Sequence, residues 1–178
     1  MDTLQILRVL KKLQIPSYGV FPVDKIPKAL GRPAGIIANT DDHKHYGSHW
    51  VALFVNKIGH GVFFYSYGMP PKVHVFQDRL RKNTITYTWN TKQLQSFNSK
   101  VCGQFCIMFL YYMNKGYSLN NFRNLFTTNQ HKNDLIVTRF YNKIKQKCNK
   151  RNKDVSNFSG QGKIRKIVWI QSCIPKMM

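Results

Sequence analysis

The chain has 178 residues and a mass of 20.9 kDa, enough for one sizeable hydrophobic core and short for two domains. Lys and Arg number 28 against 7 acidic residues, which gives a formal charge of +21. All the acidic residues are Asp, so few carboxylates are available for paired acid–base catalysis or an all-oxygen metal site. We expect neither a membrane-spanning helix nor a secretory signal, because the apolar runs are short and interrupted.

The amino-terminal part of the sequence predicts one helix and one buried strand. The helix starts at Asp2 or Thr3, which can cap it, and ends before Pro16. Its predicted apolar stripe consists of Leu4, Ile6, Leu7 and Leu10. Residues 16–33 are rich in proline and predict a loop with room for a short helix. Residues 34–39 (AGIIAN) predict a short buried strand.

The middle of the sequence predicts further strands. Residues 40–48 are polar, and residues 49–55 (HWVALFV) predict a strand too apolar to have a solvated face. Residues 56–60 predict a hairpin turn, from which residues 61–67 (GVFFYSY) return antiparallel. Residues 84–89 alternate β-branched and aromatic side chains, which indicates another strand.

The second half of the sequence predicts helices. A helical apolar stripe of core residues is formed by Cys102, Cys106, Phe109, Leu110 and Met113, and Gly116 can close this helix. Residues 118–126 predict a short helix, and residues 134–147 predict an amphipathic one. The apolar face of the latter is predicted to be Leu135, Ile136, Phe140 and Ile144. The order of helix, strands and helices predicts the α+β class.

We expect a domain over residues 1–147 and a basic, partly flexible tail over residues 148–178. Residues 148–162 are polar and predict a linker, and residues 164–170 have the propensity of a strand. Because we expect no secretory signal, we expect the cysteines to be free thiols rather than disulfides.

Positive charge at this density favours a polyanionic partner, most simply nucleic acid. The basic residues are densest around the end of the predicted long helix, where they are Lys143, Lys145, Lys147, Lys150, Arg151 and Lys153. We predict that these residues bind nucleic acid electrostatically, without sequence preference, since no motif for base readout is present. A solvated helix end is the alternative interpretation.

Three residues form a candidate catalytic site. Cys102 begins a predicted helix, where the helix dipole and unpaired N–H groups favour a thiolate and lower the pKa of a cysteine. His49 opens a buried strand and can exchange a proton with that thiol. The side-chain amide of Gln95, together with the backbone N–H of Cys102, can stabilise an oxyanion. Gly103 leaves room for a substrate backbone to approach. Each signal alone also fits an ordinary structural residue.

The stretches IIANTDD…GSHWVALFV, GVFFYSYGMPP and QSFNSKVCGQFCIMFL resemble the adenovirus-type (adenain-like) cysteine endopeptidases of DNA viruses and large DNA transposons, and more distantly the SUMO proteases. The resemblance extends from about residue 18 to residue 145, and its most specific motifs are His49-Trp50 and Gln95 with Cys102-Gly103. It implies a papain-like α+β fold, a mixed sheet packed against helices with the nucleophile at the start of the central helix. By this resemblance Cys102 is the nucleophile, His49 the general base and Gln95 the oxyanion donor.

The resemblance also implies partners and a location. It implies cleavage of viral or transposon structural-protein precursors at glycine-containing motifs, DNA binding and virion maturation. The location that it implies is the virion and the host nucleus or cytoplasm. We further expect a monomer without membrane contact. The family's peptide cofactor attaches to a cysteine upstream of the glutamine, and no cysteine precedes Cys102 here. The sequence therefore requires no cofactor, and DNA or a peptide activator stay open.

The segment Phe158–Gly162 resembles the family's cleavage pattern, while a Gly-rich turn is the plainer interpretation.

One position departs from the family. The acid that orients the histidine is replaced by Tyr65, and a phenol is neutral at pH 7, so it supplies no charge. A slow enzyme is one alternative, and a substitute orienting residue, namely Ser66, Asp41 or Asp42, is another. A catalytically degenerate module that binds or packages DNA is a third, and an isopeptidase of ubiquitin-like modifiers a fourth. A weaker hypothesis is a zinc site at the histidine cluster, which is His43, His45 and His49.

Overall fold

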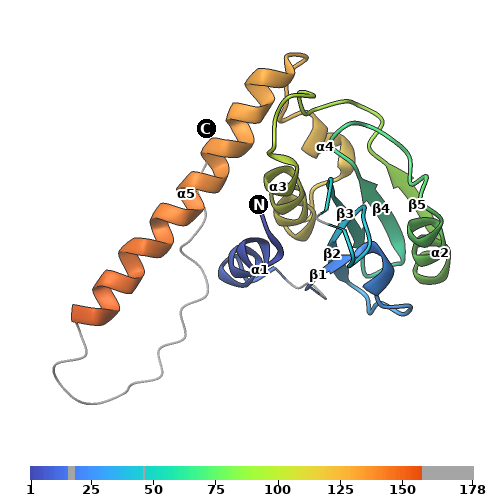
Figure 1. The fold of residues 1–178 in the computed structure, drawn as a ribbon, viewed down its shortest axis with the longest axis horizontal. Helices are drawn as coiled ribbons and strands as arrows, with labels where there is room; N and C mark the ends of the chain where they lie inside the picture. Colours follow the sequence, from blue (N-terminus) through green and yellow to red (C-terminus); the bar gives the residue numbers. More distant parts are fainter. Residues whose placement is uncertain (16–18, 46, 158–178) are drawn as a thin grey trace.

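A five-stranded mixed sheet, in the order β1-β2-β3-β4-β5, forms the middle layer of the computed structural model (Figure 1). The model describes residues 1–15, 19–45 and 47–157, with side chains described up to residue 146. The strands are β1 (Gly19–Pro22), β2 (Ala34–Asn39), β3 (Trp50–Val55), β4 (His60–Phe64) and β5 (Thr86–Trp89). The two outer pairs are parallel and the two inner pairs antiparallel.

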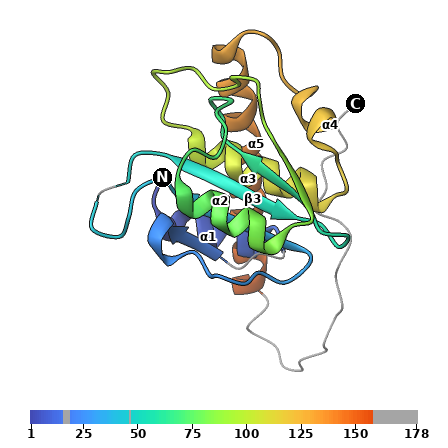
Figure 2. The ribbon, with the colours of Figure 1, turned by 90° about the vertical axis from the view of Figure 1, so that its right-hand side faces the viewer.

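Helices cover both faces of the sheet. One face carries α1 (Thr3–Lys12), α3 (Cys102–Asn114), α4 (Leu119–Arg123) and α5 (Gln130–Asn157). The other carries α2 (His74–Asn83) and the 3-10 turn η1 (Val23–Lys25). Figure 2 shows α2 in front of the sheet with α3 and α5 behind it. The predicted α+β class, a mixed sheet packed against helices with Cys102 at the start of the central helix, is confirmed.

Alternation along the strands supplies a separate core to each face. In β2, Ile37 belongs to the cluster under α3, whereas its neighbour Ile36 belongs to the cluster under α2. In β4, Phe64 and Phe63 divide in the same way. Successive side chains of a strand point to opposite faces, so a sheet covered on both sides needs apolar residues at nearly every position. This explains the continuous apolar runs from which β2 and β3 were predicted.

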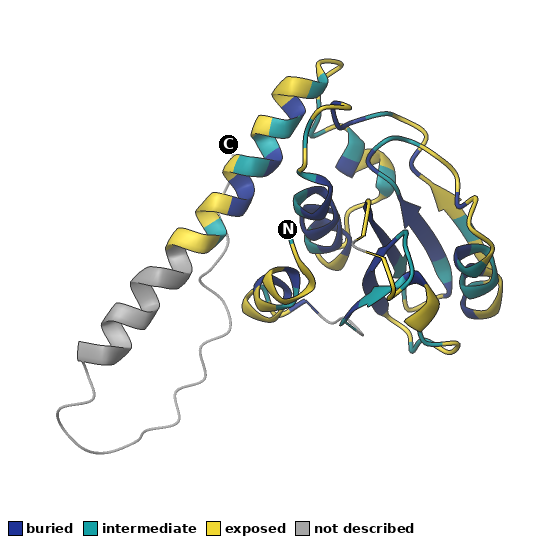
Figure 3. Cartoon of the chain, in the orientation of Figure 1, coloured by how far each residue is buried: buried dark blue, intermediate teal, exposed yellow. Residues whose placement is uncertain are grey.

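The central helix α3 is buried on almost all sides (Figure 3). It lies between the sheet and the helices α1 and α5, so only its last turn has a residue exposed to solvent. Phe109 stacks on Phe64 of the sheet with ring centroids 4.6 Å apart. The helix ends as predicted, because Gly116 adopts a φ of 85° and its N–H donates to the carbonyl of Met113. The element that carries Cys102 is therefore rigidly held.

Two predicted helix faces are corrected by the structure. In α1, the capping box of Asp2 and Gln5 forms the expected start, but Leu4 is 62% exposed and Val9 is buried instead. In α5, Leu135 is 55% exposed, while Val137 is fully buried. In both helices one apolar residue was assigned to the wrong side, because a sequence alone does not fix which side of an amphipathic stripe meets the core.

Two elements were not predicted. The strand β1 lies in the proline-rich segment expected to be a loop, and it pairs in parallel with β2. The helix α2 has only a short buried stripe, Phe76 and Leu80. Conversely, the linker predicted from residue 148 is helical as far as Asn157, because α5 continues past residue 147. The strand predicted at 164–170, the Phe158–Gly162 segment and Cys173 lie outside the described residues.

Within the described part of the chain, no helix is long and apolar enough to cross a membrane.

Candidate active site

Four segments meet at one edge of the sheet. His49 lies directly before β3, and residues 65–68 follow β4. Residues 90–101 follow β5 and lead into Cys102, the first residue of α3. Because β3 is antiparallel to β4 and β4 is parallel to β5, the start of β3 and the ends of β4 and β5 share this edge. The sheet thus brings together residues that are far apart in the sequence.

Backbone hydrogen bonds fasten the segment after β4 to the segment after β5. The carbonyl of Ser66 accepts from the N–H groups of Leu94, at 2.8 Å, and Gln95, at 3.2 Å. The side-chain amide of Asn90, itself fully buried, donates to the carbonyl of Tyr65 at 2.9 Å. These bonds hold the backbones of Ser66 and Gln95 in place, so the positions of their side chains are restricted.

Gly68 allows these two segments to approach each other. Its φ is 75°, and its N–H donates to the carbonyl of Tyr65 at 2.8 Å to close a turn. A Cβ at this position would lie 2.7 Å from the carbonyl carbon of Lys92, which is backbone and cannot move aside. Glycine is thus required here both for its conformation and for its lack of a side chain.

A chain of hydrogen bonds runs inward from His49. The His49 ring Nε2 lies 3.1 Å from Ser66 Oγ, and Ser66 Oγ donates to Gln95 Oε1 at 2.7 Å. The other end of the amide, Gln95 Nε2, donates to the carbonyl of Ser99 at 2.9 Å. Ser66 and Gln95 are fully buried, and His49 is 7% exposed.

This chain of hydrogen bonds assigns the tautomer of His49. The Ser99 carbonyl can only accept, so it fixes the amide of Gln95 with its nitrogen toward Ser99 and its oxygen toward Ser66. The single hydroxyl proton of Ser66 is then used on Gln95, and Ser66 must accept from His49. Neutral His49 therefore carries its proton on Nε2, which leaves Nδ1 as the basic atom.

Burial keeps His49 neutral. Desolvation lowers the pKa of its imidazole from 6.5 to about 4, because the charged form loses its hydration. The ring is flanked by those of Tyr65 and Tyr67, each with its centroid 4.7 Å from that of His49. Burial also raises the pKa of both phenols, so both tyrosines are uncharged at neutral pH.

Tyr65 contacts His49 through its ring and not through its hydroxyl. The two rings meet edge to face, at an interplanar angle of 64°, and no hydrogen bond joins the two side chains. The structure therefore gives Tyr65 no hydrogen-bonding role toward His49. Of the three substitutes considered, only Ser66 bonds to His49. Asp41 accepts from Ser48, and Asp42 pairs with His45.

Cys102 lies at the start of α3, as predicted, but the pKa of its thiol is raised, whereas a lowered pKa was expected. Burial raises the pKa of the thiol, and the N–H groups of Trp50 and Gly103 that face the sulfur offset this only in part. The side chain is 9% exposed, and no hydrogen bond joins its Sγ to the His49 ring. The resting site therefore holds a neutral thiol beside a neutral imidazole rather than a preformed ion pair.

Other contacts place Cys102 beside His49. The backbone N–H of Trp50, the residue after His49, faces the Cys102 sulfur. Both Tyr65 and Tyr67, which touch the His49 ring, lie within electrostatic reach of Cys102, since a thiolate there would raise the pKa of each phenol beyond the effect of burial. The second cysteine of the helix, Cys106, is fully buried and donates its S–H to the Trp50 carbonyl at 3.3 Å.

Gly103 serves packing rather than substrate approach. It is buried, and a Cβ there would lie 3.0 Å from Met1 Sδ and 3.5 Å from Ile6 Cδ1. The missing side chain thus lets α1 approach the start of α3, which corrects the expectation that it leaves room for a substrate. Trp50 supports the same contact, because its indole N–H donates to the Met1 carbonyl at 3.1 Å.

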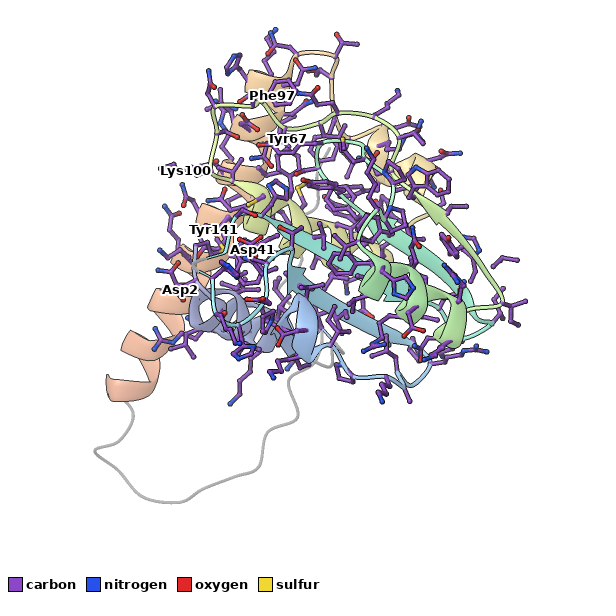
Figure 4. The ribbon with its side chains drawn as sticks, turned by 45° about the vertical axis from the view of Figure 1, so that its right-hand side comes forward. Asp2, Asp41, Tyr67, Phe97, Lys100 and Tyr141 are labelled. Carbon is purple, nitrogen blue, oxygen red and sulfur yellow. The ribbon has the colours of Figure 1, made fainter. Side chains whose placement is uncertain are left out.

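The structure also shows residues that the sequence interpretation missed. Tyr67 touches His49, and Phe97, which is 75% exposed, lies beside Tyr67 with ring centroids 5.5 Å apart (Figure 4). The two rings form an aromatic wall next to His49. No sequence signal predicted this contact, because Tyr65 and Tyr67 lie in the turn after β4, where the side-chain alternation of a strand no longer holds.

The histidines of the proposed zinc cluster have separate partners. His43 Nδ1 lies 2.5 Å from Asp24 Oδ2, and His45 Nδ1 lies 2.6 Å from Asp42 Oδ1. His49 is turned inward to Ser66. Among the described residues, no group of three or more His, Cys or Asp side chains is arranged to hold a metal ion.

Of the predicted nucleic-acid-binding residues, Lys143 and Lys145 are exposed on α5. The side chains of the others, which are Lys147, Lys150, Arg151 and Lys153, lie outside the description.

Comparison with known proteins gives a likeness in structure alone. No protein-family model and no curated protein matches the sequence. The structure is similar to the crystal structure of ASFV pS273R protease, with a TM-score of 0.45 and 22% sequence identity over 58% of this chain and 40% of that one. Its selenomethionine form gives a TM-score of 0.40 and 23% identity over 60% of this chain and 43% of that one. The chain thus spans about two fifths of that protease, and its activity is not transferred to this chain.

Proposed function

We propose that the chain is a cysteine endopeptidase in which Cys102 is the nucleophile and His49 the base. The observation that carries the proposal is the tautomer of His49. Ser66 and Gln95 hold the proton on Nε2, which leaves Nδ1 available to accept the proton of a thiol. A general base needs an unprotonated ring nitrogen, and this arrangement provides one.

In the proposed reaction, Cys102 Sγ attacks the carbonyl carbon of a bound peptide and its proton passes to His49 Nδ1. The C–S bond forms while the carbonyl π electrons move to the oxygen. His49 then gives the proton to the leaving nitrogen as the C–N bond breaks, which leaves a thioester on Cys102. Water, deprotonated by His49, attacks the thioester, releases the carboxylic acid and restores the thiol.

The thiol and the imidazole start neutral, so the proton must move during attack and not before it. The hydrogen bond between Cys102 and His49 is absent from the ligand-free structure, and such bonds often form fully only with substrate in place. Ser66 would accept from the imidazolium through its Oγ. Among the described residues no carboxylate bonds to His49 to stabilise that cation, so we expect a slower enzyme than one with a charged orienting residue.

The oxyanion is assigned to backbone groups at the start of α3. The first intrahelical bonds run from the N–H groups of Gln104 and Phe105 to the Val101 carbonyl. The N–H groups of Cys102 and Gly103 precede these bonds and face the sulfur. Gln95 is fully buried and bonded at both ends of its amide. We therefore assign Gln95 to positioning Ser66, in place of the predicted role of oxyanion donor.

The substrate class is proposed from the family resemblance of the motifs around His49 and Cys102. It comprises structural-protein precursors of a virus or transposon, cleaved at glycine-containing motifs. The aromatic wall of Tyr67 and Phe97 offers an apolar surface for a substrate side chain near the cleavage site. Non-specific DNA binding through the basic face of α5 is proposed as a second property, supported by the exposure of Lys143 and Lys145.

The test is cleavage of a library of glycine-motif peptides by the purified full chain. We expect activity that Cys102→Ala abolishes and that Cys148→Ala, which also removes one thiol, leaves unchanged. Activity equal in the wild type and Cys102→Ala would overturn the proposal. A folded wild type that cleaves neither peptides nor modifier conjugates would favour the degenerate DNA-binding module. Cleavage only of conjugates between a ubiquitin-like modifier and lysine would favour the isopeptidase.

A further inference from the structure

A basic cavity lies between α1, the segment before α3, and α5. Its volume is about 470 Å³, within the range of small-molecule sites. Its polar lining consists of Gln5, Arg8, Lys12, Lys100, Gln104 and Lys145. Lys100 and Tyr141, a further lining residue, lie along the side of the molecule that carries α5 (Figure 4).

The cations of this cavity lack acidic partners. No acidic residue is among the described residues that line it. Arg8 and Lys12 are four residues apart on α1, where like charges repel each other. Neither of these two, nor Lys100, forms an ion pair with any described residue, and Lys145 lies over the Tyr141 ring at 5.5 Å. Asp2, which is nearby at the start of α1, is engaged in capping the Gln5 N–H at 2.8 Å.

From this charge and volume, we propose that the cavity binds a ligand with two or more closely spaced phosphate groups. The four cations match the charge of such a group, and Arg8 can donate two parallel hydrogen bonds to one phosphate. The side-chain amide nitrogen of Gln5 is a further donor, because only its oxygen is used, by the Asp2 N–H. The chain's own residues 158–178 contain Lys and Arg but no acidic residue, so they do not complement the cavity.

A bound phosphate ligand would connect three elements. Arg8 and Lys12 belong to α1 and Lys145 to α5, whereas Lys100 precedes Cys102 by two residues. Gln104, which follows Cys102 by two residues, is already bonded to α5 through Thr138 Oγ1 at 3.1 Å. Binding should therefore stabilise the fold, because a ligand held by several elements binds the folded state only.

The test is isothermal titration calorimetry of the full chain with sodium tripolyphosphate and, separately, with a single-stranded oligonucleotide. The variant Arg8→Gln/Lys100→Gln removes two cavity charges. Its matched control, Lys57→Gln/Lys72→Gln, removes two exposed charges that do not line the cavity. We expect the cavity variant to bind about tenfold more weakly or worse and the control to stay near the wild type, because hydrogen bonds to charged groups are lost only in the former. Thermal unfolding checks that both variants are folded.

The two ligands separate the two sources of phosphate. Weaker tripolyphosphate binding in the cavity variant supports the site, with a free polyphosphate as ligand. Weaker oligonucleotide binding alone supports it with a nucleic-acid strand as the source. Unchanged binding of both, or an equal loss in the control variant, overturns the proposal, because overall charge would then account for the affinity. None of these outcomes depends on peptidase activity.

Discussion

Ser66 Oγ lies 3.1 Å from His49 Nε2 and occupies the place where a carboxylate is expected to orient the histidine. The residue before it, Tyr65, contacts the same ring only through its own ring, in an edge-to-face arrangement. The hydrogen bond to His49 thus comes from the residue that follows Tyr65, the position at which the family resemblance predicts an acid. A hydroxyl fixes the tautomer as a carboxylate does, but it does not neutralise an imidazolium.

Removing this hydroxyl should damage catalysis more than binding. In Ser66→Ala, His49 loses the acceptor that holds its proton on Nε2, so both tautomers become populated. We expect kcat to fall about tenfold or more with little change in KM, since general-base catalysis contributes 10²- to 10⁴-fold. Ser99→Ala is the control, because it removes a hydroxyl from the neighbouring segment after β5 and keeps the carbonyl that Gln95 uses. Equal kcat in both variants would contradict a positioning role for Ser66.

The same substitution should also lower stability. It leaves Gln95 Oε1 and His49 Nε2 without their partner in a buried environment. Leaving a buried polar group unsatisfied costs about 1–3 kcal/mol. Urea unfolding should show a larger loss of stability in Ser66→Ala than in the half-buried control Ser99→Ala, whose hydroxyl donates only a 3.3 Å bond to the Ser96 carbonyl.

Substitutions of Tyr65 separate packing from charge. Tyr65→Phe should be nearly silent in turnover, because no hydrogen bond of the hydroxyl contributes to the site. Tyr65→Asp should raise kcat by about an order of magnitude or more, since a carboxylate near His49 favours the imidazolium formed during attack. Steady-state kinetics on the two variants decide it. A large loss in Tyr65→Phe would show that the phenol acts directly, and no gain in Tyr65→Asp would indicate a site inactive for other reasons.

Strands and helices with strong periodicity were predictable, whereas short elements were not. The strands β2 and β3 and the helix α3 follow from continuous apolar runs or a helical stripe. In contrast, β1 contains Pro22 and is defined only by its pairing with β2, which a sequence does not display. The short buried stripe of α2 is likewise too weak to stand out before its partners are known.

The site residues His49, Gln95 and Cys102 were identifiable, but their chemistry depends on three-dimensional contacts. The expectation of an acidic thiol considered the helix start alone. In the fold, Cys102 is only 9% exposed, and its burial outweighs the N–H groups that favour a thiolate. Similarly, the choice of Ser66 among three candidate orienting residues depended on which of them faces inward at the edge of the sheet.

The ionisation of Cys102 provides a direct check of this point. Because burial raises the pKa of the thiol, thiolate absorbance near 240 nm should appear only at alkaline pH. Subtracting the absorbance of Cys102→Ala from that of the wild type isolates the signal of Cys102, because Cys106, Cys148 and Cys173 are present in both proteins. A thiolate that instead titrates between about pH 4 and 7 would indicate a preformed ion pair with His49.

The burial of neutral His49 predicts how stability depends on pH. Its pKa is about 4 in the folded protein and 6.5 when exposed, so between these values the unfolded chain binds more protons than the folded one. Stability contributed by this residue is therefore complete above pH 6.5 and falls as the pH drops toward 4, with a slope of at most about 1.4 kcal/mol per pH unit. The variant His49→Gln keeps a side chain that can bond to Ser66 but does not titrate. Urea unfolding of both proteins across this range should show the wild type losing stability faster than the variant. Parallel curves would mean that His49 is solvated or paired with an anion in the folded protein.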